Sequence, residues 1–145
     1  MPGLALLAIP WVTIAAAETR LQGQIRQDQI WSEENSPYRL TGALTISEGA
    51  NVTIPPGVVV RFDKGSRLEV KGSFTAGETF FDGMQDLHNR EMLLFHPGSR
   101  GHLTYCVIEN LELQIRTSDA AVTNSMISNP NGSGITVGKT CLLYT

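Results

Sequence analysis

The sequence has few charged residues, and its central part lacks any helical pattern of apolar residues. Charged residues make up 17% of the 145 residues, and the formal net charge is −3. A nucleic-acid partner is not expected, because proteins that bind nucleic acids present a basic face. Between residues 40 and 76, glycines and two prolines interrupt the chain, and no apolar run shows i, i+3, i+4 spacing. This composition excludes a helix there.

The residue spacings typical of metal and catalytic sites are also missing. The three histidines form no His-x-x-x-His pair, and the chain has no Asp-x-Asp-x-Asp-Gly loop and no Asp-Asp pair. The common zinc and calcium sites depend on such spacings. We therefore predict no cofactor, no metal ligand and no catalytic residue in this chain.

The sequence does contain a short repeat. Residues 103–110, Leu-Thr-Tyr-Cys-Val-Ile-Glu-Asn, align with residues 122–129, Val-Thr-Asn-Ser-Met-Ile-Ser-Asn, at an offset of 19. This offset is too short for two helices and a turn, and it suits one turn of a β-solenoid. We expect Ile108 and Ile127 to stack inside. Asn110 and Asn129 should stack at a tight bend, where asparagine tolerates a left-handed backbone.

Apolar-x-apolar triplets surround this repeat and extend it toward the N-terminus. Each triplet alternates between inward and outward positions, as a strand with one buried face does. One column comprises residues 93–95, 113–115 and 135–137, at offsets of 20 and 22. The earlier triplets at 44–46, 58–60 and 74–76 follow one another at shorter offsets, 14 and 16, and we interpret them as a column of the same kind.

Two arrangements of these strands fit the pattern. Short strands joined by short turns can form an antiparallel meander over residues 52–70. Recurrence of like triplets at offsets of 14 to 22 favours a coil, in which each strand pairs in parallel with its equivalent one turn later. We predict an all-β, right-handed parallel β-helix of about five turns, with rungs spaced at about 4.8 Å.

The chain also resembles a known family over residues 38–137. Segments 40–46, 52–62 and 68–77 are similar to the opening coils of bacterial right-handed parallel β-helix repeat proteins, which share the pectin-lyase-like fold. Segments 106–110 and 126–135 resemble the generic repeats of that family. The resemblance implies the fold but not one function, because the family includes polysaccharide lyases, hydrolases, adhesins and many proteins of unknown role.

The N-terminal and C-terminal segments differ from the repeat. Residues 4–17 are uncharged and end in three alanines, which predicts a secretory signal peptide over residues 1–17 and therefore export. Residues 18–40 are predicted to cap the open end of a β-helix at 41–137, with Trp31 and Tyr38 shielding the first coil. The tail at 138–145 abandons the pattern and resembles a truncation artefact, or else a short cap.

The two cysteines are interpreted from their spacing. Cys106 and Cys141 stand at an offset of 35, which is not a whole number of turns, so we expect them not to stack. They could pair only in an oxidising compartment. Cys106 is expected to point into the solenoid or to lie in a turn, as a small apolar residue.

Candidate binding residues gather where the repeat lapses, between residues 80 and 100. In solenoids, an insertion of this kind loops out from one face and often forms the binding wall. The alternative is a solvated loop without a role in binding. The side chains that could hold a ligand are Asp82, Asp86, His88, Glu91 and His96.

These observations favour a non-catalytic, secreted or cell-surface module that contacts a polysaccharide or another surface ligand, with no membrane span after signal cleavage. The alternative is a polysaccharide lyase or hydrolase whose active site lies mostly beyond this fragment. The resemblance implies that such lyases use Ca²⁺ and a basic residue that takes a proton from the uronate. The outward residues of the early coils that could serve this chemistry are Arg61, Asp63, Arg67 and Glu69.

Overall fold

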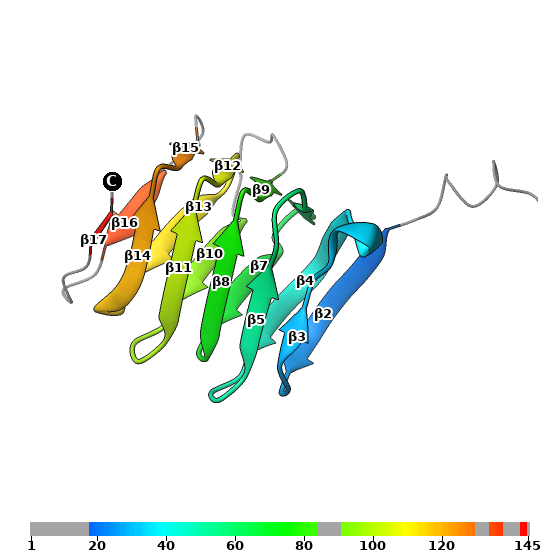
Figure 1. The fold of residues 1–145 in the computed structure, drawn as a ribbon, viewed down its shortest axis with the longest axis horizontal. Helices are drawn as coiled ribbons and strands as arrows, with labels where there is room; N and C mark the ends of the chain where they lie inside the picture. The colour runs from blue at the N-terminus through cyan, green and yellow to red at the C-terminus, as the bar shows by residue number, and fades with distance from the viewer. Residues whose placement is uncertain (1–17, 84–90, 130–133, 138–142, 145) are drawn as a thin grey trace, which may run out of the picture.

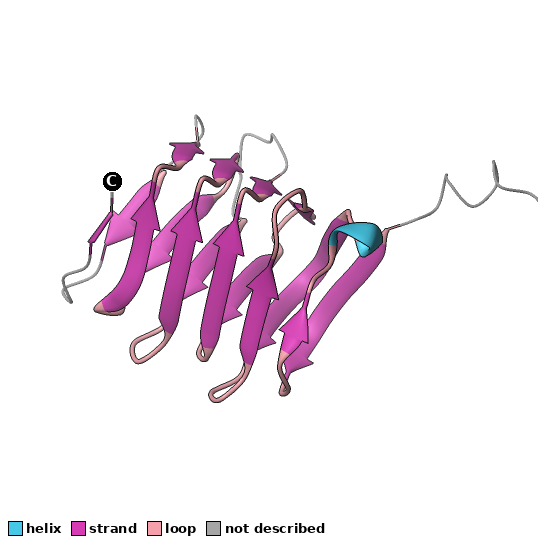
Figure 2. Cartoon of the chain, viewed as in Figure 1, coloured by secondary structure: helices cyan, strands magenta, loops and turns pink. Residues whose placement is uncertain are grey.

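The protein is a parallel β-solenoid of about five turns (Figure 1). A computed structural model describes residues 18–83, 91–129, 134–137 and 143–144. Most of this chain is strand, and the one helical element within the described residues is the short 3-10 turn η1 (Glu33–Asn35), as Figure 2 shows. No helix in these ranges is long and apolar enough to cross a membrane.

Three parallel ladders make up the walls of the solenoid. Within the described residues each ladder contains six strands, so about five turns separate its first strand from its last. The first ladder contains the N-terminal halves of β2 (Thr19–Ile25) and β4 (Tyr38–Ile46), then β6 (Val59–Phe62), β9 (Phe80–Asp82), β12 (Val107–Glu109) and β15 (Met126–Ser128). The second contains the C-terminal halves of β2 and β4, then β7 (Arg67–Val70), β10 (Met92–Phe95), β13 (Glu112–Ile115) and β16 (Ile135–Val137). The third contains β3 (Gln29–Ile30), β5 (Asn51–Ile54), β8 (Ser73–Gly77), β11 (Arg100–Thr104), β14 (Asp119–Thr123) and β17 (Leu143–Tyr144).

The register confirms the repeat predicted from residues 103–110 and 122–129. Ile108 pairs with Ile127 in the first ladder, and Thr104 pairs with Thr123 in the third. The column of triplets at 93–95, 113–115 and 135–137 is also confirmed, since these segments are successive strands of the second ladder. The prediction of stacked turns with like side chains in register therefore holds for this half of the chain.

The spacing interpreted as a column nearer the N-terminus is wrong. Leu44 pairs with Leu68 rather than with the 58–60 triplet, and Phe74 pairs with Val52. The offsets of 14 and 16 therefore connect strands of different ladders. The meander alternative is also excluded, because β5 and β7 pair in parallel with strands of neighbouring turns.

The interior of the solenoid is apolar and closely packed. Inward positions on all three ladders are occupied by residues such as Val60, Leu113 and Leu103, which are fully buried. A chain of aromatic contacts crosses several turns, because Phe74 lies 6.0 Å from Phe81 and 6.2 Å from Phe95 between ring centroids. Burying each such ring contributes roughly 1.5–3 kcal/mol.

Residues 19–30 continue the ladders at the N-terminal end. Strand β2 pairs with β4 and β3 pairs with β5, both in parallel. Trp31 stacks on Tyr38 with ring centroids 5.3 Å apart, and both side chains are almost completely buried. Trp31 thus closes the interior and is not available to stack on a sugar at the surface.

The bends between ladders use left-handed residues. Asn110 has a φ of 61° between the first and second ladders, as predicted, whereas Asn129 is not among the residues with positive φ. Between the third and first ladders, Glu78, Tyr105 and Asn124 take the same conformation on three successive turns. These four bends therefore turn the chain at a left-handed residue between extended strands.

The pattern also continues into segments that were expected to depart from it. Leu143 and Tyr144, in the predicted tail, pair with β14. The lapse at 80–100 is shorter than predicted, because β9 and β10 both lie on the ladders. Cys106 points inward, which is one of its two predicted positions, and its burial raises the pKa of the thiol; Cys141 lies outside the described residues.

Candidate functional site

The outward side chains of the first ladder form a single row in which basic residues give way to acidic ones. Arg20 pairs in register with Arg39, and Arg39 pairs with Arg61. Arg61 is followed by Asp82, and Asp82 by Glu109. Because rungs of a sheet are about 4.8 Å apart, each charge in this row has its neighbours within reach of a shared ligand.

Arg39 is held on both sides by carboxylates. Its Nε donates to Asp63 Oδ1 at 2.6 Å, and its Nη1 lies 3.3 Å from Glu18 Oε1. Glu18 also contacts Arg20 Nε at 3.4 Å. The hydrogen bond to Asp63, followed by that to Glu18, raises the pKa of Arg39 above its usual value. Arg39 is therefore a fixed cation and cannot serve as a general base.

Arg61 differs from Arg39 in having no such partners. Its side chain is exposed, and within the part of the chain that the structure describes it makes no hydrogen bond or ion pair. A guanidinium can bind a carboxylate through two parallel N–H···O bonds. Arg61 is thus a cation of this row that is ready to bind an external anion.

A cleft of about 210 Å³ brings these groups together. It is lined by Glu18, Arg39, Arg61, Phe62, Asp63, Asp82 and Gly83. Gly83 follows β9 at the bend, where its N–H donates to the carbonyl of Glu109 at 2.8 Å. A side chain at this position would collide with the carbonyl oxygen of Asn110. The bend therefore requires glycine at this position.

The cleft combines the guanidinium of Arg61 with several hydrogen-bond acceptors. Arg61 can bind an anionic group, while the carboxylates of Asp63 and Asp82 can accept hydrogen bonds from hydroxyls. The described residues contain no group of three or more His, Cys, Asp or Glu side chains that could hold a metal ion. A ligand that carries both carboxylate and hydroxyl groups matches this set.

Of the five predicted binding residues, the three that the structure describes, Asp82, Glu91 and His96, lie in different places. Asp82 lines the cleft, whereas Asp86 and His88 lie outside the described residues. Glu91 is 2% exposed, and its Oε2 accepts a hydrogen bond of 2.6 Å from the backbone of Gly65. The buried carboxylate of Glu91 therefore holds the turn at Gly65 in place and is not exposed to a ligand.

His96 lies on a different wall. Its Nε2 is 2.8 Å from Glu69 Oε1 on the neighbouring rung of the second ladder. Arg67 Nε binds the other oxygen of Glu69 at 3.2 Å. The sequence grouped four outward residues, Arg61, Asp63, Arg67 and Glu69. The structure separates them, because Arg67 and Glu69 lie on the second ladder. Arg61 lies on the first ladder, and Asp63 directly follows that strand.

Glu18 and Arg39 were not identified from the sequence as site residues. A signal for Arg39 was present, because Arg20, Arg39, Arg61 and Asp82 recur at offsets of 19, 22 and 21 along the chain. These offsets match the turn length, but the assignment of the early triplets to a column with offsets of 14 and 16 obscured them.

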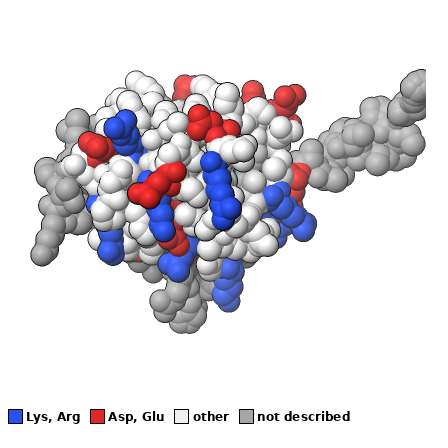
Figure 3. All heavy atoms as spheres, turned by 90° about the horizontal axis from the view of Figure 1, so that it is seen from below, with Lys and Arg blue, Asp and Glu red and all other residues white. Residues whose placement is uncertain are grey.

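One face of the molecule carries charges of both signs (Figure 3). On the face shown in Figure 3, basic and acidic side chains are interspersed, and most of the surface between them is uncharged. Such mixing differs from the continuous basic patch of a nucleic-acid-binding face. The row of charged residues on the first ladder differs from this mixed arrangement, because its basic residues come first along the axis and its acidic residues follow.

Comparison with known proteins gives one partial likeness. No family model and no solved structure matches the chain. Over 68 residues, 46% of the chain, the sequence is 34% identical to Protein bark beetle of Drosophila melanogaster. The chain spans about 2% of the length of that protein. Membership of a bacterial pectin-lyase-like family remains a prediction, and the structure establishes the parallel β-solenoid.

Proposed function

We propose that the chain is a non-catalytic β-solenoid module of an exported protein, and that it binds an acidic polysaccharide in the cleft beside Arg61. The observation that supports this is the exposed guanidinium of Arg61 in one cleft with Asp63 and Asp82. A uronate offers a carboxylate to the arginine and ring hydroxyls to the two acids. The row of residues in register along the first ladder suits a ligand that also repeats.

The ladders give the module the stiffness that a binding surface needs. Continuous parallel pairing runs from β2 to β15 in the first ladder, and the buried core extends from Ile25 to Val122. The backbone of such a framework does not need to be reordered when a ligand binds, which favours affinity. The proposed location, at the cell surface or outside the cell, rests on the uncharged segment at 4–17.

Binding to polygalacturonate tests this function. Replacing Arg61 with Gln should weaken the affinity at least about tenfold, because a charge-assisted hydrogen bond contributes roughly 1.5–3 kcal/mol. The matched control is Arg100→Gln, which removes an exposed arginine from the third ladder. Titration calorimetry of both variants provides the measurement. An equal loss of affinity in both variants, or no binding of polygalacturonate by the unaltered protein, contradicts the assignment of the cleft beside Arg61 as the binding site.

A second function is favoured by one observation. Besides Glu18, the cleft contains two carboxylates from successive turns, Asp63 and Asp82, although the sequence has no Asp-Asp pair. Paired carboxylates at a set separation are the requirement of glycoside hydrolases. Under this alternative the chain belongs to a polysaccharide lyase or hydrolase.

The two functions are distinguished by product formation. Incubation with uronate polymers, followed by absorbance of unsaturated products and by reducing-end assay, detects lyase and hydrolase activity respectively. Each reaction is run with and without Ca²⁺, and with the Asp82→Asn variant. Activity that disappears in this variant, or on chelation of Ca²⁺, would overturn the non-catalytic role.

A further inference from the structure

The outward row at the centre of the third ladder carries no Asp, Glu, Lys or Arg from β3 to β14. In register, Ile30 lies beside Thr53, Thr53 beside Thr75, Thr75 beside His102, and His102 beside Ala121. All but Ala121 are exposed. This wall therefore differs from the first ladder, where the corresponding row consists of charged residues.

The N-terminal end of this row opens into a hollow of about 440 Å³. It is lined by Asp28, Gln29, Ile30, Asn51 and Thr53. This lining contains no basic residue, so an anionic ligand has no countercharge in it. The hollow is separate from the cleft beside Arg61, since the two share no lining residue.

The polar groups of the hollow are held in place by hydrogen bonds. Asp28 Oδ1 accepts from the backbone N–H of Asn51 at 3.0 Å and from its Nδ2 at 3.3 Å. Gln29 Oε1 accepts from Trp31 Nε1 at 3.1 Å, and Trp31 is itself buried. Groups that are already oriented lose less entropy when a ligand binds.

Ile30 supplies an apolar surface in the same hollow. Its side chain is 73% exposed, although isoleucine is among the residues most often buried. A pyranose ring presents an apolar C–H face and equatorial hydroxyls. Ile30 can contact that face while Asp28, Asn51 and Thr53 bond the hydroxyls.

We propose that this hollow binds an uncharged sugar unit of a neutral polysaccharide. The chain of the ligand continues over Thr53 and Thr75, whose hydroxyls repeat at the rung spacing of about 4.8 Å. The site is independent of the cleft proposed for acidic polysaccharides, because it lies on the third ladder and binds its ligand without a basic residue.

Affinity electrophoresis in gels that contain xylan, galactomannan or hydroxyethylcellulose tests the site. Retardation is expected in at least one of these gels. Ile30→Ala removes the apolar contact and Thr53→Arg fills the hollow, so both should weaken retardation about fivefold or more. The control Thr45→Arg places the same side chain on the second ladder and should leave the affinity unchanged.

Two further experiments distinguish binding at this site from binding in the cleft beside Arg61. Arg61→Gln should leave retardation in neutral gels unchanged, and so should about 1 M salt, at which charges are screened beyond about 3 Å. The proposal is overturned if no neutral polysaccharide retards the protein, or if Thr45→Arg or Arg61→Gln weakens retardation as much as Thr53→Arg does. It is also overturned if the exposed Ile30 only promotes self-association, seen as Ile30-dependent dimers without sugar binding.

Discussion

At the scale of single residues, the close stacking of turns decides which glycines can be replaced. Gly83 lies directly against the backbone of the next turn, where a Cβ would meet the carbonyl oxygen of Asn110. A backbone oxygen cannot move aside as a flexible side chain can. A Cβ at Gly77, in contrast, would have its nearest neighbour, Thr104 Cγ2, at 3.9 Å, and Gly77 has no positive φ.

Replacing these two glycines with alanine should therefore have opposite effects on stability. Gly83→Ala should destabilise the protein by about 1–3 kcal/mol, as overpacking of a core does. Gly77→Ala should be neutral or stabilising by about 0.4–1 kcal/mol, because alanine restricts the unfolded chain. Urea unfolding followed by circular dichroism measures both. Equal stability of the two variants would show that the turns are not packed as closely as the contact at Gly83 requires.

Such differences between residues could not be predicted from the sequence. Both glycines follow a short apolar segment and precede a turn, so their local patterns are alike. What separates them is the backbone one turn further along the axis, which depends on the register. For Cys106 the sequence left an inward position and a turn open, and the structure shows the inward one, since its side chain is buried.

At the scale of strands, the stability of the solenoid depends on dry columns of inward side chains. Ile108 is fully buried and pairs with Phe81 on one side and Ile127 on the other. Ile108→Asp would place a carboxylate in this column with no partner, which costs more than a lost hydrogen bond. We expect loss of the cooperative fold, or destabilisation above about 4 kcal/mol.

The comparison variant is Thr75→Asp, at an exposed outward position of β8. It should leave solubility and the β-sheet circular dichroism spectrum unchanged. If the two aspartates have similar effects, the inward and outward assignment of the strands is wrong. The measurement needs only expression yield, spectra and thermal denaturation.

The strand ladders were predictable where the turns are regular in length. Leu103 and Val122 pair at the same offset as the other residues of their repeat, so equivalent residues align without gaps. Phe74 and Gly101 also pair in register, although a longer stretch of chain separates them. Loops of unequal length hide such pairs from any fixed period. Arg61 and Asp82 stand at a regular offset of 21, and they were not recognised as neighbours because the early triplets were assigned to a column with offsets of 14 and 16.

At the scale of the whole molecule, the aromatic residues connect the first turn to the centre. Trp31 contacts Phe74 with ring centroids 6.1 Å apart, and Phe74 contacts Phe81 and Phe95. Gly101, which pairs with Phe74, leaves the space that the ring of Phe95 occupies. Several turns thus share one packed core, and they should unfold together.

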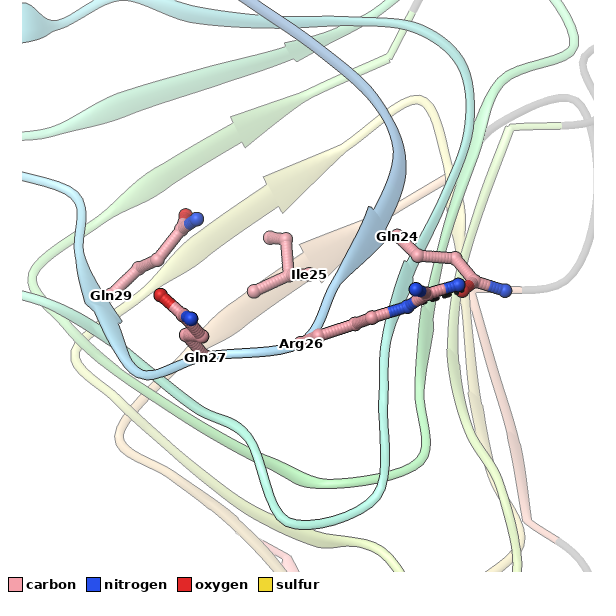
Figure 4. A pocket seen from close by; sticks show the side chains of 5 residues that line it. All are labelled: Gln24, Ile25, Arg26, Gln27 and Gln29. Carbon is pink, nitrogen blue, oxygen red and sulfur yellow. Dashed lines mark hydrogen bonds between the residues drawn. The ribbon is translucent and has the colours of Figure 1, made fainter.

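Within the described residues, β2 pairs only with β4 and β3 only with β5, so the first turn has an outer strand edge without a partner among them. A hollow of about 530 Å³ lies there, lined by Gln24, Ile25, Arg26, Gln27 and Gln29. Figure 4 shows Ile25 at its middle, with glutamine side chains on both sides. Arg26 Nη2 donates to Gln24 Oε1 at 2.7 Å, so part of this polar rim is ordered.

Polar side chains at an open strand edge oppose end-to-end pairing. The double variant Gln24→Leu/Gln27→Leu makes the rim apolar and should cause concentration-dependent association. The matched control, Thr45→Leu/Gln114→Leu, adds two leucines on the wall of the second ladder, where strand edges are already paired. Sedimentation velocity over a range of concentrations compares the two variants. If the control associates as strongly as the end variant, general hydrophobicity rather than the open ladders drives association, and the glutamines do not protect the end.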